Sequence, residues 1–112
     1  MFPRSRRLAH RHDINLVLRR GRRLMGSGLT LRFLRTGNPH PRYTVVVGKG
    51  VSKRAVIRNR VKRQMRHLLA AETKQLNCGV DIMMTILSPW QAQSKIERRS
   101  SLRELLRRSR LR

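Results

Sequence analysis

Residues 57–68 of this chain run Ile-Arg-Asn-Arg-Val-Lys-Arg-Gln-Met-Arg-His-Leu, and their spacing predicts an α-helix with two unlike faces. Apolar residues recur at intervals of three and four, so a helix brings them to one side: Ile57, Val61, Met65 and Leu68. The opposite side carries Asn59, Lys62, Arg63 and Arg66. We therefore expect a helix from about Lys53 to about Gln75 that packs one face on a core and turns the other toward anions.

The segments on either side of this helix have the patterns of β-strands. Leu29 to Leu34 alternates in the way of a strand with one face on a core, and Tyr43 to Val47 is rich in β-branched residues. Only a turn containing Gly and Pro separates these two strands, so we expect them to pair antiparallel. Val80 to Leu87 is largely apolar on both faces, with Asp81 and Thr85 as exceptions, which is typical of a central strand. Arg22 to Met25 is a candidate for a minimal extra strand.

Two further helices are predicted near the chain ends. The first is short, carries Ile14, Val17 and Leu18 on one side and ends at Gly21. The second starts with the capping-box spacing from Ser94 to Glu97, and its apolar stripe consists of Leu102, Leu105 and Leu106. The order helix, two or three strands, helix, strand, helix predicts a compact α+β fold. We expect a flexible basic arm over 1–9, one domain over 10–108 and a basic tail over 109–112.

The charge of the chain points to a polyanionic partner. Lys and Arg number 28 against 5 Asp and Glu in 112 residues, so the formal net charge is +23. Such a charge repels itself in the free protein and attracts nucleic acid. Of the cations 23 are Arg, whose planar guanidinium grips phosphate in a bidentate way and stacks on bases. The lone Cys78 and the lack of a long apolar run favour a cytoplasmic protein.

Other chemistries find little support in the sequence. The segment Gly48 to Lys53 lacks the order of a nucleotide-binding phosphate loop. His10 and His12 flank an Arg, which opposes a metal ion. The five acids are scattered, so a protein-only two-metal nuclease has no ligand cluster. Trp90 follows Pro89, and packing is favoured there over base stacking.

Residues 58–66 hold five cations on the helix described first, which favours contact with a phosphate backbone. A ribosomal or chromatin-like structural protein would fit the charge and size equally well. A membrane-active cationic peptide is a third alternative, but it needs an exposed apolar face, whereas each apolar stripe here has a sheet or helix to cover it.

Arg58-Asn59-Arg60 followed by Val61-Lys62-Arg63 resembles the RNR signature of the bacterial ribonuclease P protein family. The similarity extends over roughly residues 8 to 108. It includes Val47-Gly48-Lys49 at a strand end, Ala55 before the signature, the first helix ending in Gly21, and the last strand with its Pro89. The resemblance is specific because the signature sits at the expected place on the second helix.

The resemblance implies a two-layer α/β sandwich, of the kind seen in the second domain of a small-subunit ribosomal protein, with a left-handed βαβ crossover. It also implies the protein subunit of ribonuclease P, an endonuclease that removes the 5′ leader from precursor tRNA. In that family the RNA subunit performs the hydrolysis with bound Mg²⁺. The partners implied are the ribonuclease P RNA and precursor tRNA, with no catalytic residue in the protein.

Family positions carried onto this chain give two RNA-contacting sets. The catalytic RNA is expected to contact Arg58, Asn59, Arg60, Lys62, Arg63 and Arg66, with Lys49, Lys53 and Arg54 in the preceding segment. A leader-binding cleft is expected at Ile14, Leu18 and Arg32. The cleft positions commonly carry aromatic rings in the family, so here charge is expected to matter more than stacking. Gly50 stands where the family often has a second Lys, which removes one expected phosphate contact.

Overall fold

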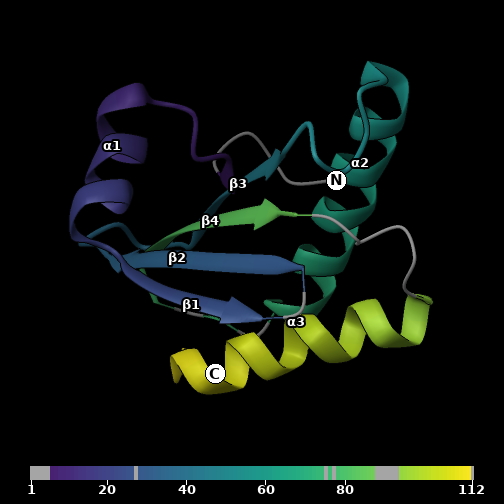
Figure 1. Cartoon of the computed structure of the whole chain (residues 1–112). Coiled ribbons are helices and arrows are strands. Elements are labelled where there is room, and N and C mark those ends of the chain that lie inside the picture. The colour runs from purple at the N-terminus through teal and green to yellow at the C-terminus, as the bar shows by residue number, and fades with distance from the viewer. Residues whose placement is uncertain (1–5, 27, 75, 77, 88–93, 112) are drawn as a thin grey trace.

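The computed structural model describes residues 6–26, 28–74, 76, 78–87 and 94–111, and Figure 1 traces the chain. The part of the chain that is described contains three helices and four strands. The elements are α1 (Arg11–Arg20), β1 (Arg22–Gly26), β2 (Leu29–Arg35), β3 (Arg42–Val47), α2 (Ala55–Glu72), β4 (Val80–Ile86) and α3 (Lys95–Ser109). The α+β class and the minimal strand β1 are thereby confirmed.

The strands form one sheet in the order β1-β2-β4-β3. β4 pairs antiparallel with β2 and parallel with β3. The predicted direct pairing of β2 with β3 was therefore wrong, because β4 is inserted between them. The reason lies in β4 itself: six of its seven residues are buried, so it takes the centre of the sheet. The β3–α2–β4 unit is a crossover between parallel neighbours, and its left hand stays a prediction.

Helices lie on both faces of the sheet. One face packs on α2 and α3 and holds the main core, which includes Leu31, Ile82 and Met84 from the strands. The alternate residue Met83 faces the other way and packs with Val17 of α1. In Figure 1, α1 lies at the upper left, α3 along the bottom beside β1, and α2 at the right. The short α1 thus adds a partial layer to the main two-layer sandwich.

The core reaches beyond both ends of the predicted domain. Leu8 is 3% exposed, and its N–H donates to the Tyr43 carbonyl over 2.8 Å. At the other end Ser109 belongs to α3, and Leu111 packs into the main core. Leu8 and residues 109–111 thus belong to the folded part of the chain, where the sequence predicted a flexible basic arm over 1–9 and a basic tail over 109–112, because the sheet and its helices cover the apolar side chains of Leu8 and Leu111. Within the described residues no helix is long and apolar enough to traverse a bilayer.

Polar contacts fix the helices on the sheet. The Tyr43 hydroxyl lies 2.7 Å from that of Thr73, just after α2, and burial raises the pKa of Tyr43. Glu72, at the end of α2, is buried and accepts from Arg103 of α3 over 2.9 Å. The capping box predicted at the start of α3 is confirmed: Ser94 and Glu97 each accept a hydrogen bond from the other's backbone N–H. The expectation for Trp90 and Pro89 lies outside the described residues.

Candidate nucleic-acid interface

Helix α2 is anchored to the sheet by its apolar side. Val61, Met65 and Leu69 are buried in the main core, while Ile57 and Leu68 pack against it and remain partly exposed. The sequence placed Leu68 rather than Leu69 among the core residues; the two side chains point about 100° apart, and the packed arc of α2 is turned toward Leu69 near the end of the helix. The predicted division of α2 into two faces is confirmed, and the helix is held along most of its length.

The outer side of α2 gathers the predicted polar residues. A shallow hollow of about 260 Å³ is lined by Asn59, Lys62, Arg63, Arg66 and His67. Arg60 is exposed on the same helix but is not among the residues that line the hollow. A hollow with three cations at fixed helical spacing can bind consecutive phosphates of a nucleic acid. Each guanidinium or ammonium group neutralises a phosphate and releases the counterions that had neutralised it. His67 was missed by the sequence reasoning, although it follows Arg63 at the spacing of one helical turn.

Arg58 has a structural contact in addition to its expected role. One of its terminal nitrogens donates to the Ser52 carbonyl over 2.9 Å, and the Ser52 hydroxyl accepts from the Arg54 N–H over 3.1 Å. Val51 in the same segment is buried, so the chain between β3 and α2 is held at two points. The exposed side chains of this segment that the sequence assigned to RNA are Lys49, Lys53 and Arg54.

The acidic residues lie away from this surface. Glu72 contacts Arg99 and Arg103, Glu104 contacts Arg107, and Glu97 caps α3. No carboxylate belongs to the set of described residues that line the α2 hollow. The positive charge of the α2 hollow is therefore not offset by any carboxylate among the described residues that line it, which favours a polyanion there.

The described residues do not fit a bound Mg²⁺. This ion prefers several oxygen ligands, including carboxylates. Asp13 and Asp81 approach one another only through Arg42, whose guanidinium contacts both. Among the described residues there is no group of three or more His, Cys, Asp or Glu side chains that could hold a metal ion.

The three residues predicted for a leader cleft lie on the side of the sheet that α1 covers, but they differ in exposure. Arg32 is the register partner of Met83, so both point to the face on which α1 packs. Ile14 packs against the small cluster beneath α1, whereas Leu18 is 46% exposed. Strand alternation places Thr44, Val46 and Thr85 on this face too. The sequence reasoning missed these three, although the period-two pattern of their strands carries that information.

Comparisons with known proteins identify the family of the chain. A family model described as Ribonuclease P matches residues 2–110. The ribonuclease P protein component of Pseudanabaena is 40% identical over 77% of this chain and 75% of its own length. That of Acidothermus cellulolyticus is 36% identical over 95% of this chain and 89% of its own.

Solved structures show the same fold. The ribonuclease P protein of Staphylococcus aureus superposes with a TM-score of 0.83 at 20% identity, over 95% of this chain and 96% of that one. The Thermotoga maritima protein gives a TM-score of 0.79 at 24% identity, over 91% and 96% of the two chains. With the family match and the sequence relatives, these findings show that the chain belongs to the bacterial ribonuclease P protein family.

Proposed function

We propose that the outer face of α2 binds the catalytic RNA of ribonuclease P, and that the sheet face beneath α1 binds the 5′ leader of precursor tRNA. The chain is the protein component of this tRNA-processing endoribonuclease. The observation that carries the proposal is the α2 hollow: Asn59, Lys62, Arg63 and Arg66 line one side of a helix whose other side is buried.

The cationic surface of α2 is already rigid before RNA binds, which favours tight binding. Residues three and four apart on a helix lie about 5–6 Å from one another, a spacing that allows neighbouring cations to meet neighbouring phosphates. Because Val61 and Met65 are fully packed, α2 does not have to be ordered on binding, and the entropy cost falls mainly on the exposed side chains. Lys49, Lys53 and Arg54 extend the same cationic surface toward β3.

In this proposal the RNA subunit performs the cleavage, with Mg²⁺ held mainly by the RNA. The metal supplies charge stabilisation and an activated water for phosphodiester hydrolysis. The protein contributes charge: its cations offset phosphate repulsion between the RNA subunit and the precursor. We place this activity in the cytoplasm, where precursor tRNA is made in bacteria.

The leader is proposed to cross the face that carries Arg32, Thr44 and Thr85. Arg32 offers a guanidinium plane to a base or a charge to a phosphate. Ile14 and Leu18 offer apolar contact without a ring. Leader affinity in this chain therefore depends more on charge than on stacking.

Reconstitution tests the proposal. The purified chain is added to a bacterial ribonuclease P RNA, and cleavage of a precursor tRNA is followed across a Mg²⁺ titration. We expect the chain to lower the Mg²⁺ concentration needed for cleavage, and to bind a leader-bearing precursor more tightly than mature tRNA. Unchanged cleavage, together with binding to ribosomal RNA of similar strength, would favour the alternative of a structural RNA-binding protein.

A further inference from the structure

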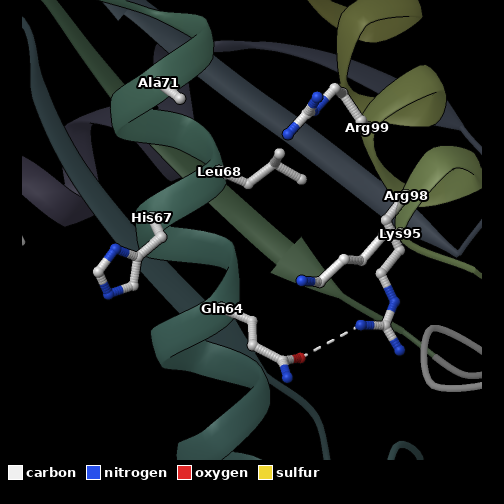
Figure 2. Close-up of a pocket in the computed structure, with 7 residues that line it drawn as sticks. All are labelled: Gln64, His67, Leu68, Ala71, Lys95, Arg98 and Arg99. Atoms are coloured by element: carbon white, nitrogen blue, oxygen red, sulfur yellow. Dashed lines mark hydrogen bonds between the residues drawn. The ribbon is translucent and has the colours of Figure 1, made fainter.

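A second basic hollow lies between α2 and α3, and we call it the α2–α3 groove. It has a volume of about 390 Å³, and its floor includes the aliphatic side chains of Leu68 and Ala71. Figure 2 shows Lys95, Arg98 and Arg99 extending from α3 toward α2. Its described lining residues are Gln64, His67, Leu68, Ala71, Lys95, Arg98 and Arg99.

The groove is strongly cationic. Arg99 lies 3.7 Å from Glu72, but the same carboxylate accepts from Arg103 at 2.9 Å, so two guanidinium charges face one carboxylate there. Lys95 and Arg98 add two further positive charges, and Arg98 donates to the Gln64 side chain over 3.3 Å. The groove therefore keeps a net positive charge after its nearby carboxylate is counted.

The position of these cations works against the stability of α3. Lys95 is the first residue of the helix, and Arg98 and Arg99 follow at the spacings of one turn, so like charges lie side by side. They also lie near the positive end of the helix dipole, where cations are unfavourable. Arg107 and Arg108 occupy the last turn, where the dipole favours them. Local helix energetics explains the cations of the last turn, and Glu97 with the capping box in the first, but it does not explain why Lys95, Arg98 and Arg99 are cations.

The α2–α3 groove adjoins the hollow on the outer face of α2. His67 lines both this groove and the hollow formed by Lys62, Arg63 and Arg66. In Figure 2 the His67 ring lies on the side of α2 away from α3. An RNA strand on the outer face of α2 therefore meets the edge of the groove one turn further along the helix.

We propose that the α2–α3 groove binds an unpaired nucleotide of the RNA subunit. This inference rests on the proposed function, and it extends the RNA interface from α2 to α3. Lys95, Arg98 and Arg99 hold the phosphates, and the base lies over Leu68 and Ala71. Gln64 offers an amide to the base edge. The apolar floor argues for an unpaired nucleotide rather than a duplex, because the flat faces of the bases are stacked on one another in a duplex and only an unpaired base can lay its face on Leu68 and Ala71.

The test compares two double variants of the full chain. Lys95→Ala/Arg98→Ala removes two cations from the groove, while Arg107→Ala/Arg108→Ala removes two from the other end of the same helix. Both variants lose the same net charge, so a nonspecific effect of charge weakens them equally. Circular dichroism and urea unfolding establish that each variant is folded before its affinity for ribonuclease P RNA is measured across a salt series.

We expect the groove variant to bind the RNA roughly tenfold to fiftyfold more weakly near 0.1 M salt, with a log–log salt slope smaller by about 1.4. The control variant should stay close to wild type. Chemical probing of the RNA 2′-hydroxyls should show at least one unpaired nucleotide that wild type protects and that the groove variant leaves reactive.

Equal losses of RNA affinity in the two variants, or an unchanged protection pattern, would overturn the proposal that the groove binds a nucleotide. The proposed function would remain intact. A loss confined to the affinity of the assembled enzyme for precursor tRNA would also overturn it, since the groove would then contact the substrate. Failure of the proposed function is distinguishable, because wild type itself would then neither bind the RNA subunit selectively nor assist cleavage.

Discussion

Arg42 holds Asp81 through two hydrogen bonds across the boundary between the parallel strands β3 and β4. Its Nε lies 2.8 Å from Oδ1 and its Nη2 lies 2.7 Å from Oδ2. Asp81 is 2% exposed, and the Arg42 Nη1 also lies 3.3 Å from Asp13 of α1. The hydrogen bond to Asp81 is the main reason that the pKa of Arg42 is raised. One guanidinium thus joins α1 to two strands.

Arg42→Ala should destabilise the fold, because it leaves the buried Asp81 carboxylate without its partner. We expect the free energy of unfolding to fall by about 3 kcal/mol, the lower end for a buried pair, since Arg42 is itself partly exposed. Urea unfolding measures the change. Arg107→Ala, which removes an exposed ion pair with Glu104, is the control and should change little. Equal effects of the two variants would show that burial of Asp81 does not matter.

Arg60→Ala/Arg63→Ala should weaken association with ribonuclease P RNA and flatten its salt dependence. Each lost phosphate contact should reduce the log–log slope by about 0.7 to 0.9. Filter binding across a salt series measures both quantities, and Arg107→Ala/Arg108→Ala serves again as the charge-matched control. A variant that keeps the wild-type slope would mean that these side chains do not touch phosphate.

Arg32→Ala should reduce the affinity of the assembled enzyme for a leader-bearing precursor and leave RNA-subunit binding unchanged. The reason is its place on the sheet face beneath α1, away from the outer face of α2. Precursors with and without a leader, measured side by side, separate the two effects. If Arg32→Ala weakened the binding of the leader and of the RNA subunit equally, Arg32 would not belong to the leader site.

Leu18→Phe should have the opposite effect on leader affinity. Leu18 is largely exposed, so a ring can replace it without crowding the small cluster beneath α1. Stacking of one base on an aromatic ring contributes about 1–3 kcal/mol, so we expect the leader-dependent part of the affinity to increase several-fold. Leu16→Phe, at a half-buried position of the same helix, controls for added bulk. No gain from Leu18→Phe would place the leader away from α1.

The capping box of α3 should make stability depend on pH. Hydrogen bonding to Ser94 lowers the pKa of Glu97 below its usual range. Because the folded pKa is the lower one, the stabilisation is complete above the unfolded pKa of about 4.3 and is lost as the pH falls through the folded value. The difference in unfolding free energy between wild type and Glu97→Ala should therefore shrink from pH 6 to pH 3. Glu97→Gln, which caps without titrating, is the control.

Most of the fold could be predicted from periodicity alone. The two faces of α2, the strand at Val80 and the capping box at Ser94 all follow from local patterns, because a helix and a strand impose different spacings on apolar residues. The strand order could not be predicted that way. A Gly and Pro turn between β2 and β3 favours a hairpin locally, and only the competition for the centre of the sheet, which β4 wins by burial on both faces, excludes it.

The candidate site also contains residues that local patterns predict and residues that they do not. Lys62, Arg63 and Arg66 were predictable, since they share one face of one helix. The contact of Arg98 with Gln64 was not, because it joins two helices whose packing no local pattern encodes. The contact of Arg58 with Ser52 was not either, because it depends on how the loop before α2 folds back on the helix. Leu8 was assigned to an arm for a similar reason: a single apolar residue among arginines gives no periodicity, and its burial depends on a strand far along the sequence.

The central place of β4 has a consequence for synthesis on the ribosome. β2 can pair with β1 as soon as both are made, but β3 pairs only with β4 in the sheet, so it cannot join these strands until residues 80–86 have left the exit tunnel. Until then β3 and α2, which pack on one another, are not joined to the β1–β2 pair, and the core around Val61 and Met65 is incomplete. The outer face of α2 therefore reaches its native position only after β4 has been synthesised. An incomplete nascent chain cannot bind RNA through this surface as the folded protein does.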